Sequence, residues 1–138
     1  MKTALVGLPM AGKKTLFTLL SRRHVPESRK PGEAMEGVAQ VRDPRIDRLT
    51  EICKPEKKVY AENRFILCPD ANTGGTSHEW LDAARKCDLL CLVLGAFQTG
   101  AADVQKERAN LDAELLLADM EIVDKRLARI AKEKRSGT

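Results

Sequence analysis

Nine residues near the start of the chain have the types and the spacing of a phosphate-binding loop. They follow a short apolar run, residues 4–6, and fit the pattern G-x-x-x-x-G-K-[ST] up to its last position. In such a loop the glycines allow a tight turn, backbone N–H groups and a helix N-terminus point at the phosphates, and the lysine adds positive charge. The predicted phosphate-binding residues are Gly7, Leu8, Pro9, Met10, Ala11, Gly12, Lys13, Lys14 and Thr15.

Lys14 is the departure from this pattern. A Ser or Thr usually follows the loop lysine and offers its hydroxyl to Mg²⁺, but here Thr15 comes one residue late. The sequence therefore predicts a loop that holds phosphate, and it puts magnesium binding in doubt. The Lys14 ammonium could offset part of the phosphate charge that Mg²⁺ usually neutralises. Alternatively, Lys14 could point to solvent, where its positive charge would be mildly unfavourable because of the helix dipole. A third interpretation is a glycine-rich turn that binds no ligand.

Two further side chains are candidates for the same site. Asp70 follows a predicted strand over residues 64–68, where such folds place a carboxylate that orients Mg²⁺ through water. The spacing from Asp70 to Gly74 gives the pattern D-x-x-x-G, whereas such sites usually have D-x-x-G. The alternative to a metal-linked role is that Asp70 is a turn residue. His78 is a candidate catalytic base near a γ-phosphate, and the alternative is an exposed histidine in a first helical turn. The catalytic residue is otherwise unknown.

The segment over residues 24–36 corresponds to the loop in which GTPases use a threonine to reach the metal and the γ-phosphate. Its prolines, its glycine and its changes of charge predict an irregular loop. No threonine occurs between Thr18 and Thr50. The contact is therefore either absent or made by another group.

Alternating strands and helices are predicted around these residues. Asp43 and Pro44 form a favoured helix start, as N-cap and first helical residue. The expected strands cover residues 3–6, 37–41, 64–68 and 89–94, and the expected helices cover 13–22, 44–53, a segment that starts near Thr76, and 103–134.

The helix predicted over residues 103–134 contains neither glycine nor proline and is long for a domain of this size. Its apolar residues step by four and three, the spacing of a coiled-coil seam. We expect the seam to pack on a partner helix, either within a longer chain or from another subunit. We divide the chain into a nucleotide-binding domain (1–100) and this helix (101–138). The seam residues are Ala109, Ala113, Leu116, Met120, Val123, Leu127 and Ile130.

Composition narrows the class of protein. The chain has 138 residues, 43% of them hydrophobic and 32% charged, with a net charge of +4, which fits one ordinary globular domain. The basic clusters at residues 22–30 and 125–135 could contact the phosphate backbone of RNA, or they could belong to a helix face exposed to solvent.

The four cysteines form no C-x-x-C pair, which argues against a zinc site. Three of them lie in apolar runs, as buried free thiols do, and this suggests a reducing cytosol. The longest apolar run, residues 89–97, is too short to cross a membrane.

The chain resembles the N-terminal part of the YchF or Obg-like proteins, a branch of the GTPase superfamily that binds ATP as well as GTP, or in preference to it. Segments outside the phosphate loop carry most of the resemblance, because they are far more specific. The matching segments are residues 6–20, 37–38, 41–56, 113–121 and 123–127.

The resemblance implies a three-layer α/β fold, a P-loop NTPase of the G-domain type. Its sheet would be mostly parallel, in the order 2-3-1-4, with the second strand antiparallel to its neighbour. A helical arm would begin near Leu111, and roles linked to ribosomes and stress responses would be expected. The base-reading segment of the family would follow Thr138, so the choice between GTP and ATP stays open.

Two hypotheses of function follow. The first is a GTP- or ATP-binding protein whose hydrolysis is weak or lost, because Lys14, the missing threonine of the first switch and the Asp70 spacing all weaken magnesium-linked chemistry. The residues 72–77, in the position of the second switch, are also fewer than the family has. The alternative is a non-catalytic module that binds a ribosome or a protein. If the chain is complete, its open edge strand and its seam predict a homo-oligomer. A cytoplasmic location is expected.

Overall fold

The computed structural model describes residues 1–28, 30, 32–71, 79–97 and 101–136. Strands and helices follow one another in the predicted order, and most of their ends lie within two or three residues of the expected positions. The elements are β1 (Lys2–Val6), α1 (Lys13–Ser21), β2 (Met35–Val41), α2 (Pro44–Cys53), β3 (Ala61–Leu67), α3 (Glu79–Ala84), β4 (Leu89–Leu92) and α4 (Ala101–Ser136).

The four strands form one mixed sheet in the order β2-β3-β1-β4, which confirms the predicted order. β1 runs parallel to both neighbours, with Leu5 opposite Leu67 of β3 and Cys91 of β4, and β2 runs antiparallel to β3. β4 ends at Leu92, two residues earlier than predicted, although the backbone N–H of Val93 still donates to the carbonyl of Val6 (2.7 Å). The carboxyl ends of β1, β3 and β4 therefore meet at one edge of the sheet.

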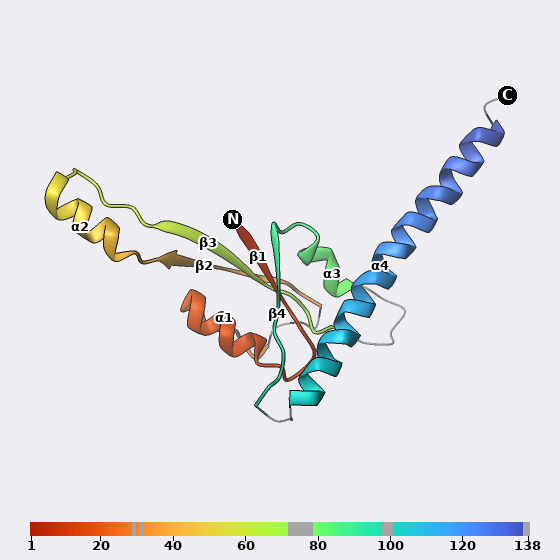
Figure 1. Cartoon of the computed structure of the whole chain (residues 1–138), viewed down its shortest axis with the longest axis horizontal. Coiled ribbons are helices and arrows are strands. Elements are labelled where there is room, and N and C mark those ends of the chain that lie inside the picture. Colours follow the sequence, from red (N-terminus) through yellow and green to blue (C-terminus); the bar gives the residue numbers. More distant parts are fainter. Residues whose placement is uncertain (29, 31, 72–78, 98–100, 137–138) are drawn as a thin grey trace.

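Helices cover both faces of the sheet, which confirms the three-layer fold (Figure 1). Successive side chains of a strand point to opposite faces. Leu5 and Leu67 accordingly pack with Phe17 of α1 on one face. Ala4 and Val6 pack on the other face with residues of α3 and α4: Trp80, Leu81, Ala84, Leu111 and Ala118.

α2 sits at the tip of a ribbon formed by the far ends of β2 and β3 (Figure 1). Asp43 is its N-cap, as predicted, and a side-chain oxygen accepts a hydrogen bond from the N–H of Arg45 (2.9 Å). No residue of α2 is buried, and Leu49 and Ile52 are 58% and 66% exposed. Asp47 fixes the helix to the start of β3, because it accepts a hydrogen bond from Tyr60 and pairs with a lysine of the same segment.

α4 packs on the sheet domain only through its first half. Leu111, Glu114 and Ala118 are buried there. Its second half leaves the domain and projects away from it (Figure 1). None of the helices in the part of the chain that the structure describes is both long and apolar enough to span a membrane.

The four cysteines are free thiols in different environments. Cys68 is buried behind the carboxyl end of β3, and Cys53 is exposed at the end of α2. Cys87 and Cys91 are partly buried, and burial raises the pKa of the Cys87 thiol.

Candidate phosphate-binding site

The predicted phosphate loop connects the carboxyl end of β1 to the start of α1. Gly7 is buried where the loop leaves β1, and a Cβ atom at this position would lie 2.3 Å from the carbonyl oxygen of Val93. No side chain fits there unless the chain after β4 moves. Gly12 precedes α1 with a φ of +92°, in the left-handed region that favours glycine. Both glycines of the motif are therefore required by the backbone.

Met10 also has a left-handed backbone, with a φ of 63°. It is the fourth residue of the loop, and its side chain is almost fully exposed. A non-glycine residue in this region is uncommon and carries strain unless its surroundings compensate. The loop thus holds its shape against the local preference of one of its own residues.

The N-terminus of α1 is open toward the loop. No side chain caps it, and its first helical hydrogen bond runs from the N–H of Leu16 to the carbonyl of Gly12 (3.0 Å). The N–H groups of the three preceding residues, Lys13 to Thr15, therefore have no partner within the helix. Such groups, together with the helix dipole, favour an anion at this position.

Lys13 lies folded back under the loop with its side chain only 3% exposed. Its ammonium donates to the carbonyl oxygens of Gly7 (2.7 Å) and Leu8 (2.6 Å). It also pairs with Asp70, with Nζ 2.7 Å from Oδ1. An ammonium group has three N–H donors, and all three are used by the protein itself.

Asp70 reaches the loop because the segment after β3 is tied to β1. The N–H of Cys68 donates to Leu5 (3.2 Å), and the N–H of Ala71 donates to the carbonyl of Gly7 (3.0 Å). The Asp70 side chain remains 52% exposed beside Lys13. The structure thus brings together two predicted site residues that lie far apart in the sequence.

The loop forms one wall of a cavity of about 330 Å³. Phe97, which follows β4, lies over Gly12 and completes this cavity, a role that sequence reasoning did not assign. The position of Phe97 just beyond a parallel strand was the available signal, since ligands of α/β folds bind at the carboxyl ends of strands. The lining residues are Pro9, Met10, Ala11, Gly12, Lys13, Lys14, Thr15, Asp70 and Phe97.

Glu107 of α4 supports the segment between β4 and Phe97 from behind. Its Oε2 accepts a hydrogen bond from the N–H of Gly95 (3.2 Å). Gly95 in turn lies against Ala11 of the phosphate loop. The first turns of α4 are therefore linked to the wall of the cavity through the backbone of Gly95.

The described residues do not fit a magnesium site of the usual P-loop kind. Lys14 stands where the hydroxyl ligand is expected, and the nearest carboxylate, Asp70, is engaged by Lys13. No group of three or more His, Cys, Asp or Glu side chains within the described ranges could hold a metal ion. His78 and the second-switch segment, residues 72–77, lie outside the described residues, so the predicted roles there stay predictions.

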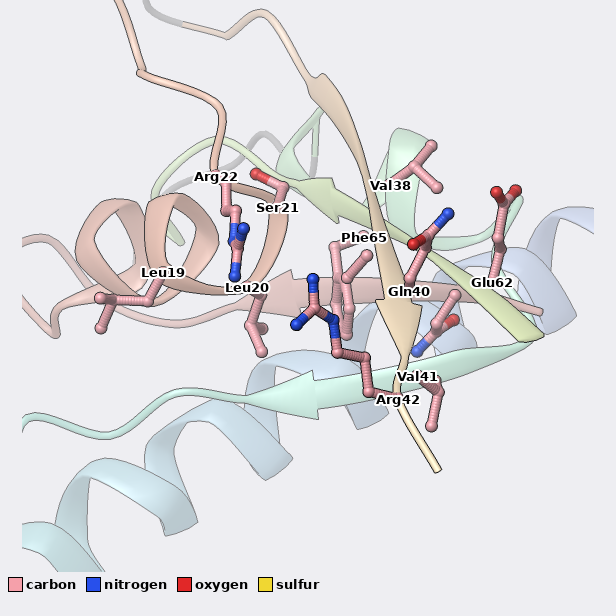
Figure 2. Close-up of a pocket in the computed structure, with 12 residues that line it drawn as sticks. Leu19, Leu20, Ser21, Arg22, Val38, Gln40, Val41, Arg42, Glu62 and Phe65 are labelled. Atoms are coloured by element: carbon pink, nitrogen blue, oxygen red, sulfur yellow. The ribbon is translucent and has the colours of Figure 1, made fainter. Parts of the chain in front are cut away.

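A second, larger hollow of about 680 Å³ lies at the opposite end of α1 (Figure 2). The last turn of α1 and the strands β2 and β3 line it with apolar side chains such as Leu20 and Phe65, and with Arg22, Arg42 and Glu62. It contains none of the predicted site residues. The candidate phosphate site is thus separate from this larger hollow.

The fold and the loop define the class of the protein: a P-loop α/β domain with a glycine-rich loop of the P-loop pattern after its central strand. No family model matches the chain. Its sequence nevertheless aligns over nearly its whole length with the YchF proteins, which confirms the resemblance: the chain is a relative of the YchF or Obg-like family.

Three comparisons illustrate this relationship. The "Ribosome-binding ATPase YchF" of Bacillus subtilis is 32% identical over 93% of this chain and 39% of its own length. That of Mycoplasma genitalium is 30% identical over 99% of this chain and 41% of its length. The solved YchF GTPase of Schizosaccharomyces pombe superposes with a TM-score of 0.68 at 27% identity, over 96% of this chain and 39% of the other. The chain thus spans about two fifths of the length of these relatives.

Proposed function

We propose that this protein binds ATP or GTP through the loop from Gly7 to Thr15 and hydrolyses it weakly or not at all. The observation that carries the proposal is the loop itself: an uncapped helix N-terminus beside a buried lysine, at the wall of a cavity of about 330 Å³. Relatives named as an ATPase and a GTPase support a nucleotide as the ligand.

Lys13 would move when the phosphates bind. In the structure its ammonium is held by Gly7, Leu8 and Asp70. A phosphate oxygen near the helix N-terminus would replace one of these partners, and the contact with Asp70, which is half exposed, is the easiest to give up. Asp70 would then be available to a water molecule or to a metal ion that arrives with the nucleotide.

Weak hydrolysis follows from the groups around the phosphates. Phosphoryl transfer depends on positioned charge and metal, with little covalent work by the protein. The hydroxyl after Lys13 is replaced by Lys14, and no threonine is available in residues 24–36. A Lys14 ammonium beside the phosphates would supply charge without the fixed geometry of Mg²⁺.

Calorimetric titration with ATP and with GTP, each with and without Mg²⁺, tests this proposal. We expect binding to at least one of the two nucleotides, with little dependence on Mg²⁺, and loss of binding in Lys13→Ala. Lys57→Ala, which removes an exposed lysine far from the loop, is the matched control and should bind normally. Absence of heat with both nucleotides under both conditions would overturn the proposal.

Lys14→Ser tests the role assigned to the second lysine. The variant restores the hydroxyl that the motif usually has, so binding should become tighter in the presence of Mg²⁺ than in its absence. Lys14→Ala, which removes the ammonium without adding a hydroxyl, should weaken binding under both conditions. Unchanged affinities in both variants would contradict any role of Lys14 at the phosphates.

The second candidate function is a non-catalytic interaction module that contacts a ribosome or a protein partner, or a further copy of itself. The observation that favours it is the large exposed apolar surface outside the nucleotide site, on α2 and on the projecting half of α4. The names of the relatives support a ribosome as partner, and such a role would place the protein in the cytoplasm. Co-sedimentation with ribosomes, in the presence and absence of nucleotide, tests this candidate.

A further inference from the structure

β2 is the outermost strand at one edge of the sheet, and no other strand of the described chain pairs with its outer side. In β3 the backbone N–H of Arg64 is used on the side of β1, so the next residue, Phe65, turns its backbone groups toward β2. The partner of Phe65 in β2 is Gly37. Because these groups alternate along a strand, the N–H and C=O groups of Val38 and Gln40 point away from the sheet.

A side-chain contact at the start of β2 agrees with this direction. The carbonyl oxygen of Glu36 accepts a hydrogen bond from Nη1 of Arg23 (2.6 Å), which comes from the loop after α1 and not from the sheet. None of the residues that the structure describes makes such a contact with the outward groups of Val38 or Gln40. The outer edge of β2 is therefore open from Val38 onward.

β2 also lacks the features that usually protect an open edge. Edge strands are commonly very short, interrupted by a bulge, or supplied with lysine or proline. β2 has seven residues, contains neither lysine nor proline, and pairs with β3 at every position from Met35 to Val41. Such an edge is a ready template for a further extended chain.

A hollow lies beside the open part of this strand. α1 approaches β2 closely at Gly37, where a Cβ atom would lie 2.5 Å from the Cβ of Ser21. The helix ends at Ser21, so it does not cover residues 38–41. The hollow of about 680 Å³ in Figure 2 occupies this uncovered space, with Leu20 and Phe65 as its apolar lining.

A strand added to β2 would place every second side chain over this hollow. Ala39 and Val41 are on the same face of β2 as Gly37, which packs against α1, because alternate residues share a face. Residues directly opposite each other in paired strands also share a face. Two side chains of the added strand, two residues apart, would therefore stand beside Ala39 and Val41 and reach the hollow.

The charges of the hollow favour an acidic partner. Figure 2 shows the guanidinium groups of Arg22 and Arg42 directed into the space between the end of α1 and β2. Neither group forms an ion pair with a carboxylate of the described residues. Glu62, the acidic residue in the lining, points away from both of them in this view. Carboxylates of a partner would supply the missing charge.

We propose that β2 binds an extended acidic peptide segment of another protein as a fifth strand of the sheet. Backbone hydrogen bonds with Val38 and Gln40 hold the segment, and its alternate side chains fill the hollow and pair with Arg22 and Arg42. A nucleic acid does not fit this surface equally well, because it has no row of N–H and C=O groups at strand spacing.

This binding surface consists of residues between Leu19 and Phe65 and involves neither α4 nor the phosphate loop. It does not rest on nucleotide binding. It goes beyond the second candidate function, because it assigns a protein partner a place on the fold and a chemistry.

NMR titration of the whole 138-residue chain, without nucleotide, tests the proposal. The probe is the capped peptide Thr-Glu-Thr-Val-Thr-Glu-Thr, which turns its acidic and apolar side chains to one face. We expect the amide signals of Val38 and Gln40 to shift, with a dissociation constant on the order of 10–500 µM, since a short peptide loses entropy when it becomes ordered. The same peptide with lysine in place of glutamate should bind at least about tenfold more weakly.

Val38→Pro tests the contribution of the backbone. It removes an outward N–H at an edge position, where proline is tolerated, and should weaken peptide binding about tenfold or more. Val38→Thr keeps the N–H and is the matched control, which should bind within about twofold of the parent. Circular dichroism and urea denaturation establish that both variants are folded.

The double variant Arg22→Gln, Arg42→Gln tests the charges without altering the strand. It should weaken binding of the acidic peptide about tenfold and remove the preference over the lysine peptide. Lys57→Gln removes an exposed cation outside the lining and should bind both peptides as the parent does.

Several results would overturn the proposal. They are the absence of shifts in β2 at about 2 mM peptide, equal affinity for the acidic and the lysine peptide, and normal binding by folded Val38→Pro or by the arginine double variant. Sedimentation without peptide that reveals a dimer abolished by Val38→Pro would also overturn it, because a second copy would then occupy the edge. The calorimetric titration with nucleotides is a separate measurement, so either proposal fails without the other.

Discussion

Lys13 Nζ lies 2.7 Å from Asp70 Oδ1, so the cation of the phosphate loop is paired with the carboxylate that follows β3. The two groups that would face a nucleotide therefore neutralise each other in this structure. Binding of a nucleotide, as proposed, would have to compete with this pair, and the strength of the competition is measurable.

Asp70→Asn removes the competing charge and should tighten binding of nucleotide in the absence of Mg²⁺. A half-exposed ion pair contributes about 0.5–1 kcal/mol, which corresponds to about 2- to 5-fold in affinity. The measurement is the calorimetric dissociation constant without metal, with Asp82→Asn, an exposed carboxylate on α3, as control. Weaker binding of the Asp70 variant only when Mg²⁺ is present would instead identify Asp70 as a metal-linked residue.

Gly7→Ala should destabilise the fold, because the added Cβ would lie 2.3 Å from the carbonyl oxygen of Val93. Relief of such an overlap requires movement of β4 against β1, and we expect a loss of about 1–3 kcal/mol in the free energy of unfolding. Gly95→Ala is the matched control, since its Cβ would meet Ala11 at an ordinary distance of 3.5 Å. Urea denaturation measures both, and equal stabilities would contradict the steric role of Gly7.

Met10→Gly should stabilise the protein by relieving the positive φ of 63°. Left-handed backbone costs a non-glycine residue roughly 1 kcal/mol, while the greater freedom of glycine in the unfolded chain offsets part of the gain. We therefore expect an increase of about 0.5 kcal/mol, measured by urea denaturation. Met10→Ala removes the same exposed side chain but keeps the penalty, so it should show no gain; an equal gain in both variants would trace the effect to the side chain.

Asp47 should contribute stability that depends on pH. Hydrogen bonds from Lys58 and Tyr60 lower the pKa of this carboxyl in the folded protein. A lowered pKa stabilises the fold above the pKa of the unfolded chain, about 3.9, and the contribution is lost as the pH falls through the folded value. Asp47→Asn should therefore be less stable than the parent at pH 7, with a difference that shrinks below about pH 4.

Urea denaturation at pH 7 and at pH 3 measures this difference. Glu56→Gln, at an exposed position in the same segment, serves as the control and should show no comparable change. The ring signals of Tyr60, the one tyrosine of the chain, report by NMR whether its contact with Asp47 is lost. A stability difference that is the same at both pH values would contradict the role of the Asp47 charge.

Local patterns in the sequence were sufficient for most of the architecture. Asp43 caps α2 and Gly12 precedes α1 as expected, because caps and turns depend on residues that are neighbours in the chain. The strand order followed from the family resemblance, which the comparisons confirm. The continuous apolar run over residues 4–6 predicted a strand, and in β1 these residues are buried on both faces of the sheet.

α4 shows where such patterns stop being informative. Its sequence contains two apolar stripes on opposite sides, one through Leu116 and Met120 and the other through Leu111 and Ala118. The sequence predicts that the first stripe packs on a partner helix, which stays a prediction. The sheet domain buries the second stripe, for which the sequence analysis assigned no role. Periodicity identifies a face that is able to pack, but the place where the helix docks on the sheet decides which face is used.

The sequence by itself determined the phosphate loop, because its glycines, its lysine and the adjoining strand and helix are contiguous and their geometry is local. Only the tertiary structure decided that Asp70 pairs with Lys13 and that Phe97 closes the cavity over Gly12. These three segments come from different strands, and their side chains meet only because β1 lies between β3 and β4 with all three carboxyl ends at one edge of the sheet.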